Sequence, residues 1–163
     1  MDLSKLSKTE LIERVEKLEL DLRSNESSFS NTLKKYFDDE KIIKKFGNEY
    51  SQLVSIIDLK GNYIEKNIAL KSLFRKELGT ENIKSVFQIS DPKHKLELEE
   101  FFKKLSENGE ASSILKTINK DKKSFYFNCY CYKYISKNGE NLAISVVEDI
   151  TQDVITNAKL KQT

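Results

Sequence analysis

Two cysteines, at positions 129 and 131, are the residues of this chain whose chemistry would be most distinctive. Side chains two positions apart on a strand point to the same face, which is poor geometry for a disulfide between Cys129 and Cys131. Free thiols are typical of a reducing compartment, so we expect a cytoplasmic protein. We interpret the two cysteines as small core residues, with a redox switch as the alternative.

Other catalytic or metal-binding chemistry finds little support in the sequence. The chain has one histidine, His94, and no Cys-x-x-Cys pair, which argues against a zinc site. No serine or cysteine has a recognisable base partner. The side chains of adjacent acids such as Glu99 and Glu100 point in different directions on a helix, which is typical of a solvated face rather than of a catalytic pair. The five glycines fall at turns or caps rather than in a phosphate-binding loop. We therefore expect neither an enzyme nor a metal-binding protein.

The composition also argues against several classes of partner. Hydrophobic residues make up 38% of the 163 residues and charged residues 33%, with a net charge of +2. A nucleic-acid groove would need a larger excess of lysine and arginine on one face. The longest apolar runs are far shorter than the ~20 residues that cross a membrane, and the first residues lack the apolar core of a signal peptide. We expect no nucleic-acid partner and no membrane segment.

The stretch from Leu142 to Thr151 is the element around which the chain is organised. Its β-branched, apolar run is typical of a central strand that is buried on both faces. The turn signal Asn138-Gly139 precedes it and predicts a hairpin with the strand before it. Thr151 is a candidate N-cap for a helix made of the last dozen residues.

The N-terminus has the pattern of a coiled-coil helix. Ser7 and Glu10 form a capping box, so a helix should begin there. Apolar residues then follow at heptad spacing at Leu11, Val15, Leu18 and Leu22. Residues 23–28 are poor helix formers, so we predict a helix to about residue 23 and a second one over roughly 29–47. The first helix either self-associates or folds against its own domain.

The remaining chain alternates strands and helices in a definite order. Two strands are predicted at 53–58 and 63–65, then short helices at 67–74 and 80–87, a longer helix at 92–108, and three strands at 113–119, 124–136 and 142–151. Two hairpins with helices between them predict an α+β fold with a five-stranded antiparallel sheet and short helices on one face.

Residues from about 51 to 153 resemble a PAS domain, a sensory module of bacterial signalling proteins. The resemblance is carried by Asp58-Leu-Lys-Gly61, Asn67-Ile-Ala69, Asn82-Ile-Lys-Ser-Val86, Asp91-Pro92, Asn108-Gly-Glu110, Lys120-Asp121, Asn138-Gly139 and Glu148-Asp-Ile-Thr151, in this order. It implies that strand 142–151 lies mid-sheet between strands 53–58 and 124–136. It also implies that Asp149 and Thr151 couple the sheet to an output helix.

A heptad helix followed by such a domain is similar to the N-terminal sensor part of histidine kinases and related regulators. The predicted organisation is a helical coiled-coil region at 1–47, a PAS-like sensor domain at 48–153, and the start of an output helix at 154–163. A downstream effector domain would then lie beyond Thr163, and the chain is expected to form a homodimer.

Along the strand 124–136, phenylalanine and cysteine residues alternate with tyrosine and asparagine residues. The face that carries phenylalanine and cysteine should point at the helices. Together with inward positions elsewhere, this face gives a set of candidates for a small-molecule pocket. They are Ile57, Leu73, Leu98, Leu115, Thr117, Phe125, Phe127, Cys129, Cys131, Ser145 and Val147. A few polar groups among apolar ones suit a ligand pocket. They equally suit a filled core with satisfied hydroxyls.

The opposite face of the sheet is rich in tyrosine and is too apolar to be left in water. The predicted cover is the helix at 29–47 or a second subunit; ordinary surface tyrosines are the alternative. The predicted dimer interface comprises Leu11, Val15, Leu18, Leu22, Tyr130, Tyr132, Ile144 and Val146.

The resemblance does not identify a cofactor. Flavin photosensors of the family carry a reactive cysteine on a mid-domain helix, and residues 67–106 contain none. Haem-binding members place a histidine on the long helix, at the position of Leu98; His94 is one turn earlier and is expected at the surface. Flavin and haem are therefore not expected. The hypotheses are a ligand sensor that shifts its flanking helices, a ligand-free dimerisation or interaction module, and a redox switch at the two cysteines.

Overall fold

The computed structural model describes residues 5–47 and 52–161, without side-chain detail for residues 21–28. A five-stranded antiparallel sheet forms its centre, in the order β2-β1-β5-β4-β3. The strands are β1 (Leu53–Asp58), β2 (Tyr63–Lys66), β3 (Glu110–Ile118), β4 (Ser124–Ile135) and β5 (Asn141–Asp149). The predicted fold class is confirmed, and β5 lies mid-sheet between β1 and β4.

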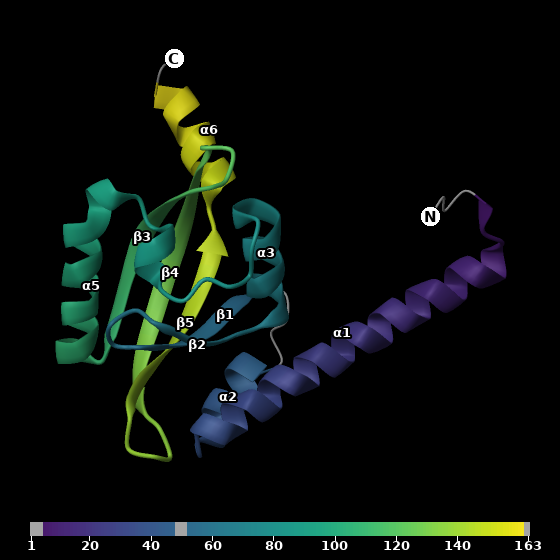
Figure 1. Ribbon diagram of the computed structural model, residues 1–163, viewed down its shortest axis with the longest axis horizontal. Helices are drawn as coiled ribbons and strands as arrows, with labels where there is room; N and C mark the ends of the chain where they lie inside the picture. Colours follow the sequence, from purple (N-terminus) through teal and green to yellow (C-terminus); the bar gives the residue numbers. More distant parts are fainter. Residues whose placement is uncertain (1–4, 48–51, 162–163) are drawn as a thin grey trace.

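Short helices cover the face of the sheet that we call the inner face (Figure 1). They are α3 (Ile68–Leu78), α4 (Val86–Ile89), the 3₁₀ turn η2 (Pro92–His94) and α5 (Lys95–Asn108). Asn67 caps α3, because its side chain accepts a hydrogen bond from the Leu70 amide. Gly109 ends α5 in the left-handed conformation, at φ 82°, and leads directly into β3.

The start of the helix predicted over 80–87 is wrong. Helical structure begins only at Val86, where Ser85 and Gln88 form a capping box. The Gln88 side chain accepts hydrogen bonds from the amides of Lys84 and Ser85. The Ser-x-x-Gln spacing at Ser85 and Gln88 that specifies this start is present in the sequence.

The N-terminal helices also differ from the prediction. Helix α1 is continuous from Lys8 to Tyr36 and does not stop near residue 23; α2 (Glu40–Gly47) follows it. Serine and asparagine lower helix propensity only by tenths of a kcal/mol each, which does not break a long helix. The break comes at Phe37, which is extended and fully buried, and Asp39 accepts a hydrogen bond from the Lys41 amide as α2 begins.

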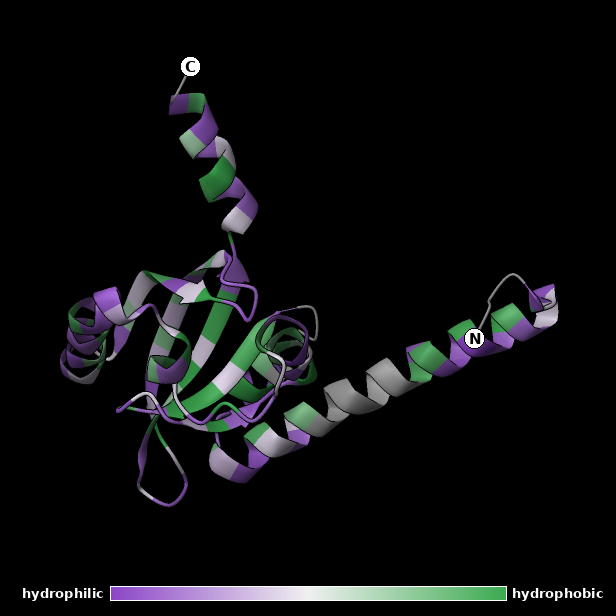
Figure 2. Ribbon diagram, turned by 45° about the horizontal axis from the view of Figure 1, so that its top comes forward, coloured by the Kyte–Doolittle hydropathy of each residue, from purple (hydrophilic) through white to green (hydrophobic). Residues whose placement is uncertain are grey.

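The last turns of α1 and all of α2 pack on the outer face of β1 and β5. The cluster consists of Phe29, Leu33, Phe37, Ile42, Ile43, Phe46, Val54, Ile56, Leu142 and Ile144, and we call it the outer core. Of the two predicted covers for this face, the helix at 29–47 and a second subunit, the helical segment of the same chain covers β1 and β5. Figure 2 shows the central strands as strongly hydrophobic, whereas polar and apolar residues alternate along the outlying part of α1.

Candidate ligand cavity and its connection to the C-terminal helix

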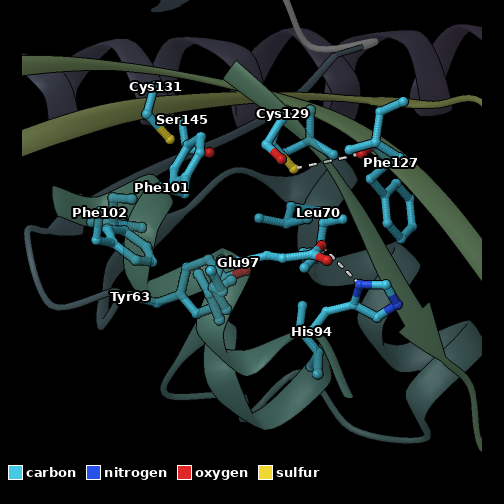
Figure 3. A pocket seen from close by; sticks show the side chains of 18 of the residues that line it. Tyr63, Leu70, His94, Glu97, Phe101, Phe102, Phe127, Cys129, Cys131 and Ser145 are labelled. Carbon is cyan, nitrogen blue, oxygen red and sulfur yellow. Dashed lines mark hydrogen bonds and ion pairs between the residues drawn. The ribbon is translucent and has the colours of Figure 1, made fainter. Parts of the chain in front are cut away.

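A cavity of about 50 Å³ lies between the inner face of the sheet and helices α3 to α5 (Figure 3). Most of the predicted pocket residues line it: Ile57, Leu73, Leu98, Leu115, Phe127, Cys129, Cys131, Ser145 and Val147. The sheet contributes them because alternate residues of β4 and β5 point inward, and the register pairs Cys129 with Val147 and Cys131 with Ser145.

Two predicted pocket residues, Thr117 and Phe125, do not line the cavity. Thr117 is 3% exposed because the segment before η2 crosses it, with Ser90 bridged to Thr117 and the Asp91 amide donating to the Lys116 carbonyl. Its hydroxyl has no hydrogen-bond partner in the described part of the chain. Phe125 lies near the start of β4 and stacks on Phe127, at a ring separation of 6.3 Å.

Aromatic residues from β2 and α5 complete the cavity, and sequence reasoning did not name them as pocket residues. Tyr63, Phe101 and Phe102 all line it. The signal for the two phenylalanines was present, because Leu98, Phe101, Phe102 and Leu105 follow the i, i+3, i+4, i+7 spacing of a buried helix face. Which part of that face would border a cavity depends on tertiary packing that the spacing does not encode.

The side chain of His94, a residue expected at the surface, is 38% exposed, but it also borders the cavity. His94 is half-buried and lines the cavity together with Glu97, and its Nδ1 lies 2.9 Å from Glu97 Oε2. The reason is η2, a 3₁₀ turn capped by Asp91, which precedes α5 and brings the histidine to the cavity. Figure 3 shows this pair on the helical side of the cavity, across from Cys129, Cys131 and Ser145 on the sheet.

The two thiols and the Tyr63 phenol in the cavity keep their protons at neutral pH. Burial raises the pKa of the Cys129 thiol to about 12 and that of the Cys131 thiol to about 11, although a hydrogen bond with Ser145 acts in the opposite sense on Cys131. Burial also raises the pKa of the Tyr63 phenol. A protonated thiol is a weak nucleophile, so the arrangement suits reversible, non-covalent binding better than thiol chemistry.

The end of β5 is joined to the last helix by a compact set of hydrogen bonds. Helix α6 runs from Thr151 to Lys161, so it begins before the predicted boundary at 154. The Asp149 carboxylate accepts from the Thr151 amide at 3.0 Å and from the Thr151 hydroxyl at 2.6 Å. The predicted coupling residues therefore contact each other at the start of α6.

The sequence predicts Thr151 as the N-cap of the last helix, and this prediction is wrong, because Thr151 is the first residue of α6. Its Oγ1 accepts a hydrogen bond from the Tyr126 amide of β4 at 3.0 Å, and the Ile150 amide donates to the Tyr126 carbonyl at 2.9 Å. Asp149 provides the cap instead. Helix α6 is thus attached to both β5 and β4.

The other end of the β4–β5 hairpin holds the break between α1 and α2. The Lys137 amide donates to the Tyr36 carbonyl at 2.8 Å, and the Lys137 ammonium lies 3.3 Å from the Asp38 carboxylate. The Tyr134 ring meets Phe37 edge-on at 5.2 Å. One hairpin therefore contacts the N-terminal helices at its turn and α6 at its open end.

The residues predicted for a dimer interface fall into different environments. Leu11, Val15 and Leu18 on α1 are 38%, 53% and 56% exposed, and Tyr130 and Tyr132 are each 40% exposed. Val146 packs against the outer core. Leu22 lies outside the described side chains. Ile144 is fully buried in the outer core beneath the helices of its own chain, so it is not part of the accessible surface.

Comparison with known proteins identifies the family. The PAS domain family matches this chain over residues 51–152. The chain belongs to the PAS domain family. It therefore contains a domain of a sensory or regulatory class. No curated protein matches the sequence.

Solved structures share the PAS fold. The PAS domain of a protein from Colwellia psychrerythraea aligns at a TM-score of 0.54 and 17% identity, over 69% of this chain and 97% of its own. The PAS domain of an HTR-like protein from Haloarcula marismortui aligns at a TM-score of 0.52 and 15% identity, over 85% of this chain and 98% of its own. An RNA-binding light-oxygen-voltage receptor aligns at a TM-score of 0.54 and 16% identity, over 75% of this chain and 36% of its own.

Two further properties concern only the described residues, 5–47 and 52–161. None of their helices combines the length and the apolar composition that crossing a membrane requires. They also contain no cluster of three or more His, Cys, Asp or Glu side chains arranged to hold a metal ion.

Proposed function

We propose that this PAS domain is a sensor that binds a small ligand in the inner-face cavity and shifts the geometry of its flanking helices. The observation that carries the proposal is the course of β5. Ser145 and Val147 line the cavity, and Asp149, two residues further on, caps α6. A ligand that moves this strand would act directly on the start of the helix.

Strand β4 supports the same route. Phe127 and Cys129 line the cavity, and Phe127 is paired with Asp149 in the sheet. Tyr126, the residue before Phe127, holds both Ile150 and Thr151 through its backbone. β4 and β5 therefore both border the ligand site and hold α6.

The size of the cavity favours a compact ligand. Its volume of about 50 Å³ lies well below the roughly 300–1,000 Å³ of pockets for drug-sized molecules. One water needs about 10–15 Å³ by the same kind of measure, so the space suits a group of a few heavy atoms. We therefore do not expect flavin or haem as the ligand.

The biological setting that we propose is a cytoplasmic histidine kinase or related regulator. Helix α6 leads away from the sheet and exposes Ile155 and Leu160, which a neighbouring helix or effector domain could cover (Figure 1). In that setting α6 would pass the state of the sheet to the effector.

The exposed seam of α1 supports a homodimer. Leu11, Val15 and Leu18 lie on one side of a helix whose described residues 8–20 have no contact that buries them. Replacing Leu18 with glutamate should weaken association, because the charge would be buried in the seam. Light scattering on the full chain should then show a shift from dimer to monomer, with Glu19→Gln as the control. A wild-type monomer would contradict the dimer.

A ligand-free interaction module is the alternative, favoured by the small cavity and the exposed α1 seam. Native mass spectrometry of freshly purified full chain separates the two functions. A ligand sensor should retain a small molecule, and Leu98→Phe, which fills the cavity from α5, should lose it. Leu96→Phe makes the same change on the same helix at a site that is 78% exposed, and should retain it. Absence of a retained molecule, together with an α6 that does not respond to cavity filling, would favour the interaction module.

A further inference from the structure

The charge distribution around the cavity restricts the class of ligand that it can hold. Its described lining includes Glu97 and His94 but no lysine or arginine. A carboxylate or phosphate ligand would find no lysine or arginine there and would meet the Glu97 carboxylate. A ligand with a positive charge would meet an opposite charge instead.

The position of Glu97 makes its carboxylate available to a ligand. Its side chain is 72% exposed, and in the described part of the chain its ion-pair partner is His94 rather than a lysine or arginine. Neighbouring Glu99 lies 3.9 Å from Lys95 and does not line the cavity. Glu97 therefore places an acceptor at the wet side of an otherwise apolar site.

The remaining walls suit an apolar group next to a cation. Tyr63, Phe101 and Phe102 provide aromatic surface, and aromatic faces attract cations as well as apolar groups. The thiols and the Ser145 hydroxyl are on the sheet side, opposite Glu97 (Figure 3). A molecule with a short hydrocarbon part and one amine would satisfy both sides.

We propose that the cavity selects small alkylamines, with the hydrocarbon group held among the aromatic and aliphatic side chains and the ammonium group paired with Glu97. This inference rests on the ligand-binding function proposed above. It adds that Glu97 is the residue that determines specificity for charge.

Three probes with one carbon skeleton test the inference: isobutylamine, isobutanol and isobutyrate. Their affinities for the ¹⁵N-labelled full chain can be measured by chemical-shift titration at constant ionic strength and at pH 8, where alkylamines are protonated. The amine should bind up to about fivefold more tightly than the alcohol, which is the usual range for an exposed ion pair. The carboxylate should bind most weakly.

Substitutions locate the effect. Glu97→Gln should reduce the preference for amine over alcohol to less than about twofold, because it removes the charge and keeps the shape. Glu99→Gln removes the same charge from the same helix away from the cavity, and should leave the preference unchanged. Leu98→Phe should weaken the binding of all three probes.

The outcomes separate this inference from the proposed function. If the alcohol binds the wild type as tightly as the amine, and Leu98→Phe weakens both, ligand binding stands and selection by Glu97 is overturned. A preference for amine that persists in Glu97→Gln also overturns it. If none of the three probes shifts the resonances of cavity residues, the ligand-binding function itself is contradicted, and the inference fails with it.

Discussion

The two faces of the central sheet are packed in different ways. The outer face of β1 and β5 is covered by the end of α1 and by α2, and Leu33, Phe37 and Ile144 are completely buried there. The inner face is covered by α3, α4 and α5 and keeps a cavity of about 50 Å³. One sheet thus carries a filled core on one side and an incompletely filled one on the other.

We therefore assign stability mainly to the outer face and ligand recognition to the inner face. Filled, apolar packing is sensitive to any change of volume, and the outer core joins the N-terminal helices to the sheet in that way. The inner face can accept a ligand because its side chains leave space. β5 belongs to both faces, with Ile144 in the outer core and Ser145 at the cavity, so it can connect the two.

The largest expected effect concerns the outer core. Replacing Phe37 with alanine should lower the free energy of unfolding by about 3–5 kcal/mol, because it leaves a cavity where α1 ends and removes the contact with Tyr134. Urea denaturation measures this. Lys34→Ala, an exposed change on the same helix, should alter stability by less than about 0.5 kcal/mol. A small loss in Phe37→Ala would show that the N-terminal helices are not part of the folded core.

Adding one methylene compares the two faces directly. Val54→Ile enlarges a side chain that is fully buried in the outer core, and should cost about 1–3 kcal/mol through overpacking. Val147→Ile makes the same change beside the cavity, where space exists, and should cost less than about 0.5 kcal/mol or stabilise the fold. Equal costs in urea denaturation would mean that the inner face is as tightly packed as the outer face.

The sequence predicts the sheet well because its signals are local. Capping residues, Asp91-Pro92 and the turn at Asn138-Gly139 mark where elements begin and end, and the apolar run of 142–149 marks the central strand. The inward face of β4, with Phe127 and Cys129, follows from alternation along the strand. The inward position of Ser145 and Val147 on β5 follows from the PAS resemblance, because that strand is apolar on both faces.

The errors come from interactions that are not local. Residues 23–28 remain helical because a long helix tolerates weak formers, and Phe37 ends it by packing on the sheet. His94 and Glu97 lie at the cavity because η2 brings them there, which spacing does not reveal. Thr151 bonds to Tyr126, 25 positions earlier, so its role could not be deduced from the cap pattern near it.

A smaller effect is expected at the junction with α6. Thr151→Ala removes an acceptor from the Tyr126 amide and a donor to Asp149, and should cost about 1 kcal/mol. Hydrogen exchange should accelerate at Tyr126 and across residues 150–161, and Thr151→Ser, which keeps the hydroxyl, should restore protection. Equal acceleration in β1 would show instead that Thr151 supports the whole fold.

The smallest effect at neutral pH concerns the two thiols. In the unfolded chain they lose their protons near their ordinary pKa of 9.0, whereas in the folded chain Cys131 keeps its proton to about pH 11 and Cys129 to about pH 12. The unfolded state then binds fewer protons, so the thiols' contribution to stability is complete below pH 9 and falls as the pH rises from about 9 to 12. The Cys129→Ala/Cys131→Ala variant should show a flatter decline between pH 8 and 10 in urea denaturation. Parallel declines would indicate that the thiols titrate normally in the fold.

The coupling of the cavity to α6 is tested most directly by hydrogen exchange on the full chain with the cavity filled by Leu98→Phe. Leu98 is on α5, away from α6 in the sequence, so a local effect of the substitution cannot account for a change there. We predict altered exchange at Tyr126, at Asp149 and across residues 150–161. Exchange in the outer core at residues 33–46 should stay unchanged, and Leu96→Phe should cause no change. Altered exchange confined to α5 and the cavity walls, with α6 the same as in the wild type, would contradict it.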